Sequence, residues 1–84
     1  KKRNKHMKLE ILTPEKKLFD DEVLSVQVPG KSGKFEMLNN HMPIVSSLQK
    51  GIIKITDSNK QEQKIEINNG VIEMKQNKII ILAE

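Results

Sequence analysis

The chain has 84 residues, no cysteine and a formal net charge of +4. This length predicts one domain with a small core, and the lack of cysteine excludes disulfides and thiolate metal sites. Four basic residues lie in the first five positions, and the other 11 basic residues equal the 11 acidic ones in number. The positive charge therefore belongs to a tail, and it does not indicate a nucleic-acid-binding domain.

The start of the chain differs in character from the rest. Residues 1–6 read KKRNKH, and His6-Met7 is typical of a junction left by cloning. We therefore expect residues 1–6 to be a basic tail, either disordered or left by cloning, and residues 7–84 to be the folded domain. The longest apolar run, residues 79–83, is too short to span a bilayer, so we expect a soluble protein that reaches a membrane only through a partner.

Short runs of alternating apolar and polar residues fill the folded part. In chain order the alternating apolar pairs are Leu9 and Ile11, Val26 and Val28, Ile53 and Ile55, Ile65 and Ile67, and Ile72 and Met74. Turn residues separate them at 28–33, 39–40, 57–60, 68–70 and 76–77. This spacing predicts an all-β fold, an antiparallel β-sandwich or flattened barrel of about ten short strands. We expect these pairs to form the core together with Phe35, Ile79 and Ile81.

Two early segments give weaker signals. Residues 14–19 (PEKKLF) open like a first helical turn but are too short for a helix, which predicts a turn or a very short strand. Asp20, Asp21 and Glu22 follow directly. In an extended chain their carboxylates point to alternate sides, so they do not converge on a metal, and we expect a solvated turn.

Several predicted strands carry apolar residues on both faces. Ile52 is adjacent to Ile53, Val71 is adjacent to Ile72, and residues 79–82 are apolar throughout. A strand with one face in solvent should alternate between apolar and polar residues. The apolar residues on the second face of these strands therefore form a second apolar row. This row meets either the interior of a closed barrel, which is our main interpretation, or another protein.

The sequence lacks the residues of an active site. His41 has no cysteine near it, and no G-x-S-x-G elbow surrounds Ser46 and Ser47. The GKSG segment at 30–33 lacks the spacing of a phosphate-binding loop. We expect no catalysis, no cofactor and no metal. Aromatic stacking platforms for nucleic acids or sugars are also missing, because Phe19 and Phe35 are the only aromatic residues besides histidine.

One family combines these features. The segments MKLEILTPEKKLF, VLSVQVPGKSGKFEML, NNHMPIVSSLQKGIIKI, NNGVIEM and NKIIILAE resemble, in this order, the N-terminal β-sandwich domain of the epsilon subunit of rotary F-type ATP synthases. The most specific element is His41-x-Pro43 followed by Leu48 and Gly51. Met42 departs from the pattern, because the family usually has a small residue there.

The resemblance implies a non-catalytic rotor subunit of the central stalk. Such a subunit binds the gamma subunit, rests on the c-subunit ring and helps to couple proton flow to ATP synthesis at the cytoplasmic face of the bacterial inner membrane. By the same resemblance, the residues that dock on these partners are Lys31, Lys34, Asn40, His41 and Met42. Most family members continue beyond this point into a two-helix domain, so the sequence fits either a truncated or a naturally short subunit.

Two other functions are compatible with a small basic β domain. One is a nucleic-acid-binding barrel, and the other is a free-standing adaptor domain. The resemblance favours the rotor subunit over both.

Overall fold

The computed structural model describes residues 6–38 and 43–84, and these fold as eight β-strands without a helix. The strands are β1 (Met7–Leu12), β2 (Lys17–Gly30), β3 (Gly33–Leu38), β4 (Ile44–Leu48), β5 (Gly51–Asp57), β6 (Glu62–Ile67), β7 (Gly70–Lys75) and β8 (Lys78–Ala83). The predicted all-β class is confirmed, and eight strands are close to the expected number of about ten; all are short except the 14-residue β2.

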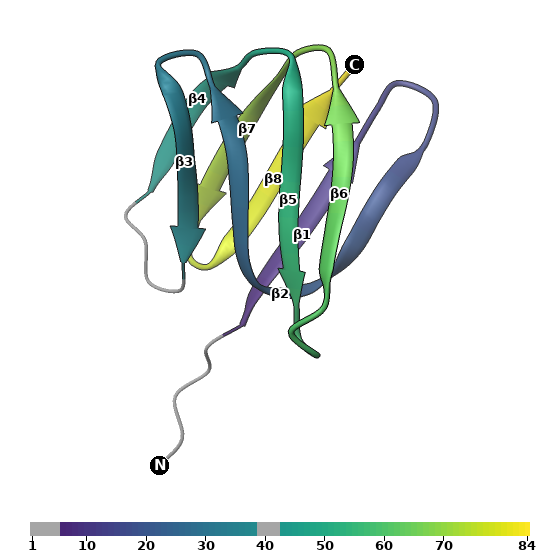
Figure 1. Ribbon diagram of the computed structural model, residues 1–84, viewed down its shortest axis with the longest axis vertical. Helices are drawn as coiled ribbons and strands as arrows, with labels where there is room; N and C mark the ends of the chain where they lie inside the picture. Colours follow the sequence, from purple (N-terminus) through teal and green to yellow (C-terminus); the bar gives the residue numbers. More distant parts are fainter. Residues whose placement is uncertain (1–5, 39–42) are drawn as a thin grey trace.

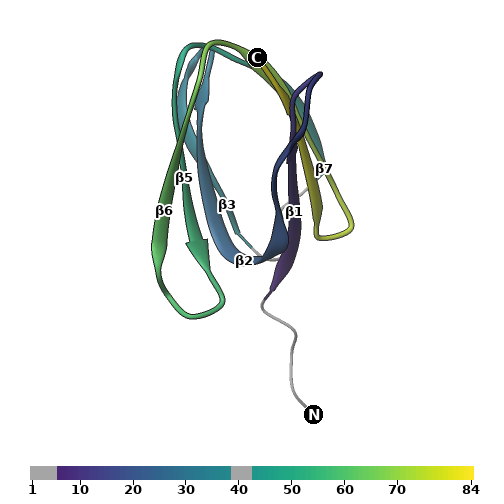
Figure 2. The ribbon, with the colours of Figure 1, turned by 90° about the vertical axis from the view of Figure 1, so that its right-hand side faces the viewer.

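The strands form two layers that face each other (Figures 1 and 2). One layer contains β3, the second half of β2, β5 and β6, and the other contains β4, β7, β8 and β1. Neighbouring strands are antiparallel except β1 and β8, which pair in parallel. The long strand β2 connects the layers, because its first half pairs with β1 and its second half pairs with β3 and β5.

The core lies between the two layers and consists of the alternating residues of nearly every strand. Most of the predicted core residues are buried, which confirms the alternation pattern, but Phe35 and Ile65 are only partly buried at its margin. The buried residues that the alternation did not predict are Met7, Val23, Met37, Leu48 and Ala83. Each stands at the end of an apolar row or in a segment without clear alternation.

The prediction of a turn is correct at Pro14 and Glu15, whereas the prediction of a solvated turn at Asp20–Glu22 is wrong. Only the Thr13–Lys16 segment is a turn, closed by a hydrogen bond from the Thr13 amide to the Lys16 carbonyl. Strand β2 already begins at Lys17, and Asp20–Glu22 lie within it rather than in a solvated turn. The reason is tertiary, because β1 supplies a complete antiparallel partner that pairs Ile11 with Phe19 and Met7 with Val23.

Two glycines of the family motif are explained by close approaches between strands. A Cβ atom at position 51 would lie 2.7 Å from Cβ of Pro29, and one at position 70 would lie 2.6 Å from the carbonyl oxygen of Leu82. Real Cβ atoms do not come this close, so Gly51 and Gly70 allow β2 and β8 to pack tightly against them.

The predicted hairpin turn at residues 76–77 is confirmed. Gln76 and Asn77 both have positive φ angles, 53° and 60°. Positive φ at both central residues is typical of the two-residue turn whose twist matches that of the flanking strands. The turn therefore fixes the register in which Lys75 is paired with Lys78.

A closed barrel does not cover the second apolar row. Ile53 and Ile72 are fully buried, whereas their neighbours Ile52 and Val71 are 50% and 42% exposed. Leu82 is 55% exposed. The sandwich thus has apolar side chains on its outer surface, and our main interpretation of this row was wrong.

Candidate interaction surfaces

The residues predicted for partner docking are only partly covered by the structure. Lys31 lies in the turn between β2 and β3, where its amide donates a 3.2 Å hydrogen bond to the carbonyl of Ser47. Lys34 lies in β3 opposite Pro29, and both lysine side chains are exposed. Asn40, His41 and Met42 lie outside the described residues, so their predicted role stays a prediction.

Strand β3 separates the two parts of the predicted docking site. Lys34 stands near its start and Leu38 at its end, roughly 13 Å apart at the usual rise per residue of an extended chain. In the described part of the chain β3 pairs with β2 alone. Among the described residues, its other edge therefore has no strand partner.

A second surface is apolar and lies on the outside of the other layer. Four residues on adjacent strands form it, and we call them the apolar stripe: Leu12 on β1, Leu82 on β8, Val71 on β7 and Val45 on β4. Leu82 is directly opposite both Leu12 and Val71. Val45 is opposite Glu73, two residues from Val71, so it lies diagonally beside Val71.

The apolar stripe is exposed to solvent, and a depression lies at one of its ends. Val45 is 71% exposed, the largest fraction among the exposed large apolar side chains of the described residues. A depression of about 460 Å³ lies at the other end, lined among others by Pro14, Leu12, Leu82 and Val71. Contiguous apolar surface of this kind on a small domain marks an interaction site.

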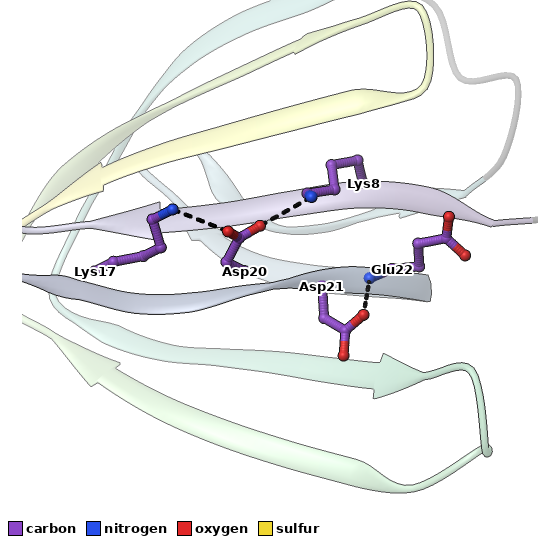
Figure 3. A network of polar contacts seen from close by, with 5 residues as sticks. All are labelled: Lys8, Lys17, Asp20, Asp21 and Glu22. Atoms are coloured by element: carbon purple, nitrogen blue, oxygen red, sulfur yellow. Dashed lines mark hydrogen bonds and ion pairs between the residues drawn. The ribbon is translucent and has the colours of Figure 1, made fainter.

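The carboxylates of β2 are divided between two sides of the strand, as Figure 3 shows. Asp20 accepts a 2.9 Å hydrogen bond from Nζ of Lys17 and lies 3.0 Å from Nζ of Lys8. Asp21 points to the other side, where its carboxylate accepts a 2.7 Å hydrogen bond from the amide of Glu22. The hydrogen bonds from Lys17 and Lys8 hold the pKa of Asp20 below its ordinary value. This cluster is an exposed ion-pair network that links β1 to β2.

Neither a metal site nor a membrane span is found in the described part of the chain. Across residues 6–38 and 43–84, the His, Asp and Glu side chains form no group of three that could hold a metal ion. The same residues include no helix of the length and apolarity needed to cross a membrane.

Sequence reasoning found the apolar stripe only in part. The adjacent apolar residues at 71–72 and 79–82 were the available signal, and they correctly indicated a second apolar row. Leu12 and Val45 were missed, and for Val45 the reason is that the segment around β4 mixes small polar and apolar residues without alternation. Its exposure depends on the pairing of β4 with β7, which a single sequence does not specify.

Comparison with protein families gives one match over the whole folded part. The model of the ATP synthase Delta/Epsilon chain β-sandwich domain matches residues 6–84. The ATP synthase epsilon chain of Campylobacter curvus is 43% identical over 76 residues, which are 90% of this chain and 59% of the relative. The ATP synthase epsilon chain of Chlorobium limicola is 38% identical over 81 residues, 96% of this chain and 92% of the relative. The chain thus spans about three-fifths of the first relative and nearly all of the second.

Solved structures give the same fold. A chain in the Euglena gracilis mitochondrial ATP synthase structure of OSCP, F1 and c-ring superposes with a TM-score of 0.90 at 14% identity, covering 99% of this chain and 53% of that one. A chain in the Tetrahymena thermophila mitochondrial ATP synthase central stalk and c-ring structure superposes with a TM-score of 0.75 at 18% identity, covering 99% and 66%. At these identities the likeness supports the β-sandwich fold alone.

Proposed function

Since the chain belongs to the ATP synthase Delta/Epsilon family of β-sandwich domains, we propose that it is a central-stalk rotor subunit that links the gamma subunit to the c-subunit ring. In this role it has no active site and helps to transmit rotation between proton flow and ATP synthesis. In this proposal the chain lies at the cytoplasmic face of the bacterial inner membrane as part of the ATP synthase complex, and its similarity to bacterial ATP synthase epsilon chains supports this position.

The exposed apolar stripe is the observation that carries this proposal. A subunit that links two partners needs two separate surfaces, and the cores of permanent interfaces are apolar. Leu12, Val45, Val71 and Leu82 supply such a surface on the layer of β1, β8, β7 and β4. We assign the gamma subunit to this surface, because a stable rotor contact requires the larger apolar burial.

The edge of β3 is the second surface, and we assign it to the c ring. Lys31 and Lys34 at its start are exposed, and both suit the polar, hydrated contacts of an interface rim. Asn40, His41 and Met42 follow its end. In this proposal His41 donates and accepts hydrogen bonds at the interface, and Met42 supplies an adaptable apolar contact.

Binding to purified gamma subunit tests the first assignment. The variant Val45→Lys with Leu82→Lys places two charges on the apolar stripe, and both positions are exposed, so the fold should be retained. We expect loss of co-purification with gamma and an unchanged thermal unfolding midpoint. The matched control is Leu38→Lys, which changes an equally exposed leucine (53%) on the other layer.

The assignment to gamma fails if the double variant still co-purifies with gamma, or if Leu38→Lys disrupts the complex as strongly. Failure of the wild-type chain itself to bind gamma would refute the rotor function. Oligonucleotide binding with a steep salt dependence would instead favour the nucleic-acid-binding barrel.

A further inference from the structure

A basic hollow lies on the outer surface of the layer formed by β2, β5 and β6, away from the apolar stripe. Its volume is about 470 Å³. Its lining residues are Gln27, Pro29, Lys34, Gln49, Lys50, Gly51, Ile52, Lys54 and Lys64, which include four lysines and no carboxylate. Pro29 is buried beneath the hollow, and Ile52 supplies exposed apolar surface within it.

The strand register brings two of these lysines together. Lys54 on β5 is directly opposite Lys64 on β6. Like charges in this arrangement are unfavourable in an antiparallel pair. The Oε2 atom of Glu62 is 3.8 Å from Nζ of Lys54, whereas no carboxylate in residues 6–38 and 43–84 lies within 4.0 Å of the Lys64, Lys50 or Lys34 ammonium group.

The other cross-strand lysine pairs of the described residues have a different environment. Lys78 on β8 is opposite Lys75 on β7 and Lys8 on β1, and Lys8 is paired with Asp20. The hollow beside Lys75 and Lys78 also includes Glu73, so a carboxylate is already present there. The hollow around Lys54 and Lys64 instead combines a like-charged pair with two further lysines and has no carboxylate in its lining. Glu62 pairs with Lys54 alone.

The surroundings restrict the size and kind of ligand. The same outer face carries Glu36 opposite Gln27, Glu62 opposite Thr56 and Glu66 opposite Ile52. A broad anionic surface such as a bilayer would press against these carboxylates as well as the lysines. A narrow ligand avoids them. Lysine ammonium groups act as separate point charges that can each pair with one anionic group. The apolar floor formed by Pro29 and Ile52 favours a ligand that also carries an apolar side chain, which a peptide has and a free phosphate lacks.

We propose that the basic hollow binds a carboxylate-rich peptide segment of a protein partner, with one apolar side chain of that segment packed against Ile52. This goes beyond the contacts proposed for the apolar stripe and the β3 edge, because Lys50, Lys54 and Lys64 belong to neither. Lys34 borders both the hollow and the β3 edge, so it is left unchanged in the test.

Fluorescence anisotropy with a labelled probe tests the proposal on the intact chain. The probe is a short peptide of glutamate and aspartate around one central leucine, and the control probe has glutamine and asparagine in place of the acidic residues. We expect the acidic probe to bind, and we expect its Kd to rise with salt concentration. The variant Lys54→Gln with Lys64→Gln should raise Kd roughly tenfold, whereas Lys75→Gln with Lys78→Gln, which removes the same charge, should leave it unchanged.

Several outcomes would overturn the proposal. One is that the acidic probe does not bind, or that it binds equally well to both double variants. Another is that the chain binds vesicles of phosphatidylglycerol more tightly than the acidic peptide and that Lys54→Gln with Lys64→Gln abolishes vesicle binding. This result would identify a lipid surface. Displacement of the probe by inorganic phosphate at concentrations where chloride has no effect would identify a phosphate site instead. Binding to the gamma subunit is measured on the same variants. Failure of the acidic probe to bind can then be distinguished from failure of the proposed rotor contact.

Discussion

Ile52 and Ile53 are neighbours of the same type with opposite environments, which makes them a direct test of the sandwich. Ile53 is fully buried and is paired with Ile65 on β6, whereas Ile52 is 50% exposed on the outer face. Replacing a buried isoleucine by alanine removes its transfer free energy and leaves a cavity, at a cost of about 2–5 kcal/mol. The total stability of a domain of this size is only about 4–13 kcal/mol. Ile53→Ala therefore removes a large share of it.

The exposed neighbour should behave differently. Ile52→Ala loses little buried area and only part of the strand preference of isoleucine, so we expect a cost below about 1 kcal/mol. Each kcal/mol corresponds to a shift of roughly 4–8 °C in the Tm of a domain of this size. Ile53→Ala should thus lower Tm by at least about 8 °C, and Ile52→Ala by less than that.

Thermal unfolding followed by circular dichroism measures both values, and urea titration gives the corresponding free energies. Equal losses in the two variants would mean that the outer face of β5 is also buried, for example in a dimer. A cost below about 1 kcal/mol for Ile53→Ala would refute the assigned core.

Two further predictions follow from the ion pairs and from the docking segment. Hydrogen bonds from Lys17 and Lys8 lower the pKa of Asp20 in the folded state below its ordinary value of 3.8. Its ion pairs therefore stabilise the fold fully above that ordinary value, and this contribution is lost as pH falls through the lower folded pKa. Asp20→Asn should therefore flatten the fall of the unfolding midpoint at acid pH, and replacing both lysines by glutamine should have the same effect. His41→Ala with Met42→Ala should leave the thermal midpoint nearly unchanged but weaken retention on the c ring. Lys34→Ala alone should do little, because an exposed ion pair contributes only about 0–1 kcal/mol. An unfolded double variant would show that His41 is a core residue, and unaltered assembly would show that it is only a surface residue.

The sequence alone determined the fold class, most of the core and the family. Alternation with a period of two assigns an inner and an outer face to each strand, and residues such as Ile53 and Ile72 follow it directly. Turns that depend on a few adjacent residues, such as Gln76-Asn77, are local and were therefore also predictable. The order of the family segments carried the functional hypothesis, and the family itself is confirmed.

Tertiary structure decided which segments pair and which apolar residues stay outside. Asp20–Glu22 form part of a long strand because β1 lies beside them, although their composition favours a turn. Val45 joins the apolar stripe only through the pairing of β4 with β7, and Lys54 meets Lys64 only through the register of β5 with β6. Pairing partners are far apart in the chain, and the local sequence does not encode which strand will lie alongside. The surfaces proposed for partners arise from that long-range pairing.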